Sequence, residues 1–327
     1  MSSLHAARGT AVRVLLAAAL AASAIAVAAE YPSRPIRVVI PYPPGGGIDI
    51  PIRALAPMLA ERLGQPLVLD NRAGATGIIG TELVARSVPD GYTLLMHSVA
   101  GLALVPNMGT PLPYDPLRDF APVTQATSAP YMLVVHPKVP AASVTQLIAY
   151  AKTRPGELNY SSSGNGSATH LAGLLFCSMA GVRMVHVPYK GAGPATADVL
   201  AGHIQTRFSA IPAALPHMKA GRLRALAVTS SGRFHLLPEL PAMAETLPGF
   251  AVDSWSAVLA PARTPAAVVR KLNAEFVGAL RAPEVKALLE ANGTEAVGSS
   301  PERLGELMRS ELKRWAPIVK AAVAAGG

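Results

Sequence analysis

Short apolar runs alternate with longer stretches of helical periodicity along most of the chain. Residues 36–40 (IRVVI) are a run of the first kind, and residues 54–63 show helical spacing that ends at Gly64. Short apolar runs are typical of buried strands, and stretches of about ten to fifteen residues with a 3.6-residue period are typical of helices. Strands are expected at 36–40, 65–70, 92–97, 131–135, 158–161, 184–187, 204–208, 223–228 and 254–259. Helices are expected at 49–63, 78–87, 144–153, 195–201 and 212–220, together with one that ends at Ala180.

This alternation predicts an α/β fold in which mainly parallel strands are joined by right-handed crossovers. A Pro-rich passage at 106–122 separates the first three strands from the others, and three further helices are expected near 265–280, 283–291 and 301–323. The tail is too small for a third core, so we expect it to pack on the first domain. The predicted domains are 30–127 with 253–327, and 128–252. The chain then crosses between them near 125–130 and 250–254, and these crossings form a hinge.

The first 29 residues have the pattern of a secretory signal peptide. Arg8 and Arg13 precede an apolar stretch from Val14 to Val27, and the small residues before Glu30 suit a cleavage site. That stretch is short for a membrane span, and nothing later in the sequence is long enough to be one. No cysteine lies near the cleavage site, so a lipid anchor is not indicated there. We therefore predict a soluble periplasmic protein.

Composition narrows the class of protein and of partner. Of the 327 residues, 50% are hydrophobic and 15% are charged, which predicts a packed globular chain. Residues 1–29 contain two of the 29 basic side chains and none of the 20 acidic ones, so the remaining 27 leave a net charge of +7. This charge suits an anionic ligand, but it is scattered and not interleaved with aromatic residues, so nucleic acid is not expected. Cys177 is the only cysteine, which excludes an intramolecular disulfide.

Two glycine-rich loops stand between an expected strand and an expected helix. The first is residues 41–49 (PYPPGGGID), and the second is residues 161–167 (SSSGNGS). Glycines let backbone N–H groups crowd around a ligand, and a helix N-terminus adds unpaired donors and partial positive charge. An anion such as a carboxylate would suit both places, and we expect the loops to face each other across a cleft. Either loop alone is equally well explained as a tight turn.

Patterns for catalysis and metal binding are weak. Ser167 follows a glycine but lacks the second glycine of a nucleophile elbow, and no acid is placed to orient His170. The histidines form no His-x-x-x-His pair, and both nucleotide-binding glycine motifs are absent. No metal and no cofactor is therefore expected. Asp49 and Asp70 are a possible acid pair, although a helix cap that also serves the loop backbone is the simpler interpretation of Asp49.

A series of motifs, each unspecific alone, becomes specific through its order. It comprises YPSRPI (31–36), PGGGID (44–49) with Arg53, NRAGATG (71–77), PDGYTL (89–94), YDP (114–116), DFAPV (119–123), SGNGS (163–167) with HL (170–171), HVPYKG (186–191), RALAVT (224–229) and LAP (259–261). Together these motifs resemble the Bug family, the extracytoplasmic solute-binding receptors of tripartite tricarboxylate transporters. The resemblance covers essentially the whole mature chain.

The resemblance implies a type II periplasmic-binding-protein fold, in which two α/β domains close like a Venus flytrap on a small carboxylate-bearing solute. It implies no enzymatic activity, and delivery of a mono-, di- or tricarboxylate by a monomer to membrane permease subunits. By position, the ligand would be held in the first domain by Tyr42, Gly46, Gly47, Asp49, Ala75, Thr76, Gly77 and Ser98. In the second domain it would be held by Ser163, Gly164, Gly166, Ser167, Thr169, His170, Lys190 and Ser209.

The chain also departs from the family pattern. Ser209-Ala210 stand where many relatives carry a polar or acidic pair, and Ala257 and Arg263 replace expected glycines. A missing acid at 209 would weaken recognition of an amino group, which favours an amine-free mono- or dicarboxylate over an amino acid. Two other functions stay open from the sequence: a periplasmic sensor subunit for the same class of solute, and a secreted serine hydrolase that uses Ser167 and His170.

Overall fold

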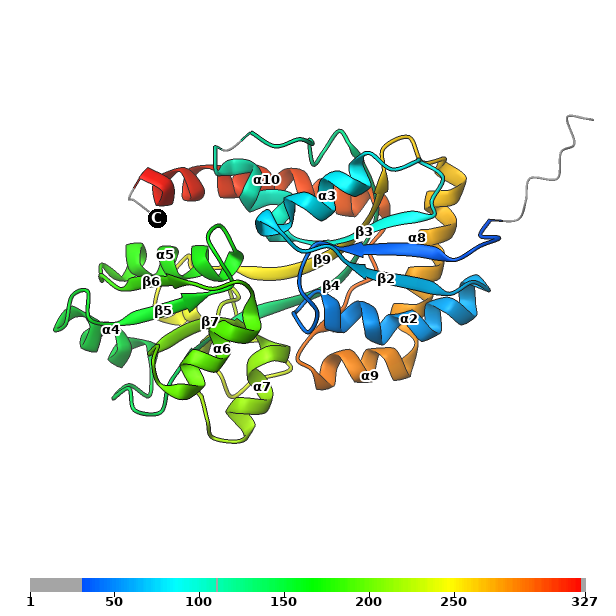
Figure 1. Cartoon of the computed structure of the whole chain (residues 1–327). Helices are drawn as coiled ribbons and strands as arrows, with labels where there is room; N and C mark the ends of the chain where they lie inside the picture. Colours follow the sequence, from blue (N-terminus) through cyan, green and yellow to red (C-terminus); the bar gives the residue numbers. More distant parts are fainter. Residues whose placement is uncertain (1–30, 110, 325–327) are drawn as a thin grey trace, which may run out of the picture.

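The chain folds into two lobes, each a sheet covered by helices, which are joined by two long strands (Figure 1). The computed structural model describes residues 31–109 and 111–324, and the predicted signal peptide lies outside these residues. The strands follow the order β2-β1-β3-β9-β4-β7-β5-β6, and β8 and β10 both pair with β4. The predicted α/β class with two mixed sheets is confirmed.

In the first lobe, β1 (Ile36–Ile40) lies between β2 (Leu67–Asn71) and β3 (Thr93–Ser98), and all three are parallel. The crossovers contain α2 (Asp49–Leu63) and α3 (Ile78–Ala85), and α2 runs through Pro57 and ends at Gly64. Short helical turns η1 (Ala75–Gly77), η2 (Ala100–Leu104) and η3 (Val105–Asn107) follow β2 and β3. Because the strands are parallel, the loops after β1, β2 and β3 meet at one edge of the sheet.

Two antiparallel strands, β4 (Phe120–Val135) and β9 (Asp253–Pro261), pass from one lobe to the other. The first part of β4 pairs with β9 in the first lobe, and residues 131–135 pair with β7 and β8 in the second. The prediction of a strand confined to 131–135 is therefore wrong. Pro122, Pro130 and the polar residues between them conceal the strand, and β4 accommodates them with register shifts at Pro122/Thr124 and Gln125/Thr127.

In the second lobe, β5 (Asn159–Ser162) pairs in parallel with β6 (Val185–Pro188) and with β7 (Thr206–Ala210), and β8 (Arg224–Val228) pairs antiparallel with β4. The connections contain α4 (Val144–Lys152), α5 (Ala168–Ala180), α6 (Ala192–Ala201), α7 (Ile211–Lys219) and the turn η4 (Met243–Glu245). The predicted boundaries of these elements differ from the observed ones by three residues or fewer.

The tail contains α8 (Ala266–Arg281), α9 (Pro283–Ala291), β10 (Glu295–Ala296) and α10 (Pro301–Ala324). As expected, it packs on the first lobe: α8 contacts β4 and α2, and α9 contacts α2. Helix α10 lies along η2 and also contacts α5 of the second lobe, so it bridges the two lobes (Figure 1). Within residues 31–109 and 111–324, no helix is both long and apolar enough to span a membrane.

Candidate functional site

The glycine loop after β1 is held in shape by one buried carboxylate. The Asp49 Oδ2 atom accepts hydrogen bonds from the Gly45 N–H (2.9 Å) and the Arg53 Nε (2.7 Å), and its Oδ1 accepts from the Asn71 Nδ2 (2.9 Å). Burial alone would raise the pKa of this carboxyl, but these hydrogen bonds outweigh burial and lower the pKa. The Asp49 side chain does not cap α2, whose N-cap residue is Ile48, so the capping prediction is wrong. Asp49 instead supports the loop backbone. It also does not pair with Asp70, which accepts hydrogen bonds from Arg37 and Arg72.

The N–H groups of this loop are left available. Among the described residues, the Gly46 and Gly47 N–H groups donate to no protein acceptor, whereas the Gly46 carbonyl accepts from the Asp49 and Ile50 N–H groups. Gly47 faces the second lobe, since a Cβ added there would lie 3.3 Å from the Ala210 Cβ. The Gly47 donor therefore lies where the lobes meet, and the Gly46 donor precedes it in the same loop.

The turn after β2 contains strained backbone. Four consecutive residues have positive φ: Gly74 (142°), Ala75 (46°), Thr76 (56°) and Gly77 (95°). For Ala75 and Thr76 this conformation is costly, and such residues cluster at functional sites. The turn places the Thr76 hydroxyl across the interface, where it donates to the Asn165 carbonyl at 3.3 Å.

Tyr42 and Ser98 belong to a buried chain of hydrogen bonds. The Thr81 hydroxyl donates to the Gly77 carbonyl (2.7 Å). Because its proton is used there, the Thr81 Oγ1 accepts from the His97 Nε2 (2.9 Å). The His97 Nδ1 then accepts from the Tyr42 hydroxyl (3.2 Å), whose oxygen accepts from the Ser98 Oγ (2.9 Å). Burial lowers the pKa of His97 to about 3, so the ring is neutral and this order is fixed. The chain ties Tyr42 to β3.

In the second-lobe loop, by contrast, side chains accept three of the N–H groups. The Ser163 N–H donates to the Thr169 Oγ1 (3.1 Å), the Gly164 N–H to the Ser162 Oγ (3.1 Å), and the Gly166 N–H to the His170 Nδ1 (3.2 Å). Ser167 caps α5 through its Oγ, which accepts from the His170 N–H at 3.2 Å. This loop therefore offers fewer backbone donors than the sequence predicts.

His170 is a structural residue of this loop. Its ring stacks on that of His186 with centroids 3.9 Å apart, and burial lowers the pKa of each ring to about 4. Because its Nδ1 accepts from Gly166, the proton is on Nε2, which is buried and unpartnered among the described residues. The ring makes no hydrogen bond to the Ser167 hydroxyl, which a hydrolase would require. In the described part of the chain, no three His, Cys, Asp or Glu side chains are grouped to hold a metal ion.

The remaining predicted residues lie at the same interface. Ser209 is buried in β7, and Lys190 is exposed next to Gly191, where an added Cβ would lie 3.6 Å from the Pro43 Cγ. Gly166 packs on Met108 of the first lobe, whose Sδ would lie 2.3 Å from an added Cβ. The structure thus brings the predicted segments of both lobes together, and adds Pro43 and Asn165 from within the two predicted loops and Met108, for which the sequence carried no signal.

Arg207 is the largest omission of the sequence prediction. It lies in β7 with 1% of its surface exposed, and its Nη2 donates to the Ser163 Oγ at 3.2 Å. Burial lowers the pKa of the guanidinium to about 10. The only signal for this residue in the sequence was an arginine within a predicted strand.

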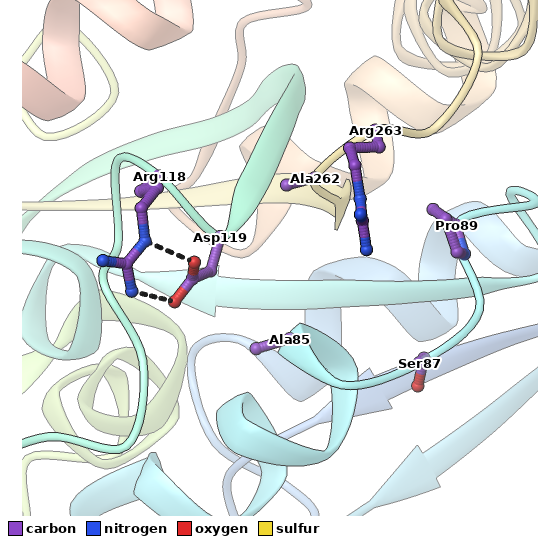
Figure 2. A pocket seen from close by; sticks show the side chains of 7 residues that line it. All are labelled: Ala85, Ser87, Pro89, Arg118, Asp119, Ala262 and Arg263. Atoms are coloured by element: carbon purple, nitrogen blue, oxygen red, sulfur yellow. Dashed lines mark hydrogen bonds and ion pairs between the residues drawn. The ribbon is translucent and has the colours of Figure 1, made fainter.

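A separate pocket of about 370 Å³ lies at the other edge of the first lobe (Figure 2). Its lining includes Ser87, Pro89, Asp119 and Arg263, which lie before β3, at the start of β4 and after β9. Arg118 and Asp119 pair there through two hydrogen bonds. Arg263 has φ 69°, consistent with a family pattern of glycine at this position. This pocket is remote from the loops between the lobes.

Two α/β lobes on a paired-strand hinge, with unpaired loop amides at the contact between the lobes, define a solute-binding protein of the type II periplasmic fold. The sequence model of the tripartite tricarboxylate transporter family receptor, TctC, matches residues 52–323. The chain belongs to this family.

Relatives support both the family and the fold. The chain is 40% identical to protein BugT of Bordetella pertussis, over 89% of this chain and 90% of BugT. The structure of Rpa4515 from Rhodopseudomonas palustris with adipate is 36% identical, covers 90% of this chain and 98% of that one, and superposes with a TM-score of 0.86. MatC from the same organism, with bound malate, is 30% identical, covers 88% of this chain and 100% of that one, and has a TM-score of 0.83.

Proposed function

We propose that this chain captures a small carboxylate-bearing solute between its lobes and delivers it to the membrane permease of a tripartite transporter. The observation that carries the proposal is the pair of unpaired N–H groups at Gly46 and Gly47, of which Gly47 lies against Ala210 of the other lobe. The relatives with adipate and malate support the ligand class, since both ligands are dicarboxylates. The family and these ligands favour a transport receptor over a sensor or a hydrolase.

The two lobes contribute different groups to this site. In the first lobe, Gly46 and Gly47 supply amides, Tyr42 and Ser98 supply hydroxyls, and Ala75, Thr76 and Gly77 form the adjoining turn. In the second lobe, Ser163 and Ser167 supply hydroxyls, and Lys190 lies at the rim. Asp49, Gly164, Gly166, Thr169 and His170 shape the loops, and Ser209 lines the base of the second lobe.

Solute binding favours the closed arrangement because the site is complete only when both lobes contribute to it. A hydrogen bond to a charged group is worth about 1.5–3 kcal/mol, so a few such bonds suffice for micromolar affinity after the cost of closure. The hydrogen bond from Thr76 to the Asn165 carbonyl joins the two lobes and would be lost if they moved apart.

Several further properties complete the proposal. Residues 1–29 direct the chain to the periplasm and are removed, and the mature chain acts as a monomer without a cofactor. The domains are 30–127 with 253–327, and 128–252, which agrees with the passage of β4 and β9 between the lobes. We propose no catalytic step, because the His170 ring binds the Gly166 N–H and the Ser167 hydroxyl binds Thr169 and the His170 N–H, so the two side chains are not hydrogen-bonded to each other.

Thermal unfolding of residues 30–327 against a panel of carboxylic acids tests the proposal. A solute at about one hundred times its Kd adds about 2.7 kcal/mol of stability, which raises Tm measurably. Each acid is compared with its uncharged amide, for example adipate with adipamide, and only the acid is expected to raise Tm. A panel in which no acid acts, or in which acids and amides act equally, would contradict the proposed ligand class.

A further inference from the structure

Arg207 has no counter-charge in the described structure. It is 1% exposed, and its guanidinium reaches only the hydroxyls of Ser161 (Nη1 to Oγ, 3.5 Å) and Ser163 (Nη2 to Oγ, 3.2 Å). Its Nε is buried without a partner among the described residues, and none of the ion pairs within that part of the chain includes it. An arginine so deeply buried normally pairs with a carboxylate.

The energetic cost of this arrangement is substantial. Removing a cation from water without a compensating anion is strongly unfavourable, and hydroxyls return only part of that energy. Burial lowers the pKa of the guanidinium to about 10, which leaves it charged at neutral pH. The fold therefore keeps a buried positive charge that its own residues do not neutralise.

The guanidinium points toward the contact between the lobes. Strands β5 and β7 are parallel, with Ser161 opposite Arg207, and Ser163 directly follows the carboxyl end of β5. Since Arg207 bonds to Ser163, its side chain extends toward the carboxyl ends of these strands. Ala210, at the end of β7, faces Gly47 there. The phenol of Tyr131 lies close enough to Arg207 to raise the pKa of its guanidinium. It also raises the pKa of Tyr42 in the first-lobe loop.

The neighbour of Arg207 on the same face of β7 carries no negative charge. Ser209 is two positions along β7 from Arg207, so the two side chains lie on the same face of the strand. The family pattern includes polar or acidic residues at this position, whereas this chain has a serine. The nearby Tyr189 hydroxyl pairs with Asp198, so this carboxylate is already engaged.

We propose that Arg207 is the anion-binding residue of the second lobe and forms a direct ion pair with a second carboxylate of the solute. This inference rests on the proposed function: the first carboxylate meets the Gly46 and Gly47 amides, and the second meets Arg207 and Ser163. The solute is then a dicarboxylate without an amino group near Arg207, because an ammonium there would be repelled.

The test is titration calorimetry on residues 30–327 with malate and the straight-chain diacids from succinate to adipate, each compared with the monoacid of the same chain length. Arg207→Met keeps the length of the side chain but removes its charge. The matched control is Arg224→Met. Arg224 lies on β8, donates to the Val139 and Ala141 carbonyls, and is remote from the contact between the lobes. We expect Arg207→Met to weaken diacid binding about 10- to 100-fold and monoacid binding less than about threefold. Arg224→Met should change neither, and Arg207→Lys should restore part of the diacid preference.

The failures of the two proposals are distinguishable. If the wild-type chain binds no carboxylate, the proposed function fails. If it binds monoacids as tightly as diacids, or if Arg207→Met weakens both equally with an unchanged Tm, the function stands and the inference is wrong. Without solute, Arg207→Met should keep or raise Tm, because it removes a buried unpaired charge. Should that variant fail to fold, Arg207 is a structural residue unless Arg207→Gln folds and shows the selective loss of diacid binding.

Discussion

The two loops that meet between the lobes are stabilised in opposite ways. In the first-lobe loop, one carboxylate, Asp49, holds the backbone from behind and leaves the Gly46 and Gly47 N–H groups free. In the second-lobe loop, neutral side chains such as Thr169 and His170 accept the backbone N–H groups themselves. A glycine-rich loop before a helix is therefore not always an anion site. Whether it can bind an anion depends on how many of its N–H groups are already hydrogen-bonded within the protein. The first lobe offers amides to a ligand, and the second offers side chains.

The largest effect is expected from removing the support of the first-lobe loop. Asp49→Ala leaves Gly45, Arg53 and Asn71 without their acceptor, so the free energy of unfolding should fall by about 2–4 kcal/mol. Solute binding should weaken about 100-fold, because the two amides lose their position. Denaturant unfolding and calorimetry measure the two effects.

The control for Asp49 is Asp90→Ala, which removes a partly exposed carboxylate that pairs with the exposed Arg34 and accepts the Tyr92 N–H. It should cost less than about 1 kcal/mol and leave the affinity unchanged. Equal effects at the two positions would show that Asp49 has no special role in the loop.

Acidic pH should loosen the second-lobe loop before the first. The pKa of buried His170 is lowered to about 4, so between pH 6.5 and 4 the unfolded chain binds a proton that the folded chain does not. The stability from this group is complete above pH 6.5 and is lost as pH falls toward 4, by up to about 1.4 kcal/mol per pH unit. In the first lobe, the pKa of His97 beneath Tyr42 is lowered to about 3, so its contribution is also lost below pH 6.5, but Asp49, which holds residues 45–49, has a pKa lowered from 3.8 and acts until lower pH.

Amide hydrogen exchange at pH 7, 5.5 and 4.5 separates these two loops. Residues 162–170 should lose protection over this range, while residues 43–49 keep theirs. In His170→Asn, whose side chain does not titrate, the protection of residues 162–170 should depend less on pH. If both loops respond in parallel, the contrast between them is not electrostatic.

A smaller effect is expected from crowding the contact between the lobes. In Gly47→Ala the new Cβ would lie 3.3 Å from the Ala210 Cβ, so closure should cost about 1 kcal/mol and affinity should fall about fivefold with Tm unchanged. Gly46→Ala is the matched control, because the nearest atom to its Cβ would be the Pro43 carbonyl oxygen at 3.8 Å. A loss of affinity at both positions would point to the loop backbone instead of the contact.

The smallest effect concerns the hydrogen bond between the lobes. Thr76→Val keeps the branched shape and the left-handed backbone but removes the donor to the Asn165 carbonyl. Since that bond is exposed, affinity should fall only about two- to fivefold. Thr153→Val removes an exposed hydroxyl that donates to the Tyr150 carbonyl in α4 and should leave the affinity unchanged.

Local pattern predicted most of the fold, because apolar runs such as 36–40 become buried strands and Gly64 and Gly181 end their helices in the left-handed conformation. It missed the first part of β4, where Pro122 and Pro130 disguise a strand that only its pairing with β9 reveals. The two-residue strand β10 and the helical turns η2, η3 and η4 were also missed, because elements this short carry no periodic pattern.

The location of the site was predicted better than its hydrogen bonds. Glycine spacing located both loops, but sequence does not show which N–H groups are already paired, and that depends on Thr169 and His170 folding back onto the second loop. Arg207 was missed because an arginine in a strand reads as a surface charge. Only its tertiary contact with Ser163 shows that it is buried.

The pairing of β4 with β9 constrains how the receptor opens. The ladder runs from Phe120–Pro261 to Pro130–Asp253 with two register shifts, so the lobes cannot separate by parting these strands without losing backbone hydrogen bonds. We expect opening to occur as a change of twist along this two-stranded ribbon, concentrated where its register shifts between Pro122 and Thr127. The lobes would then rotate about an axis close to the ribbon, and α10 would slide over α5 with little change in the interior of either lobe.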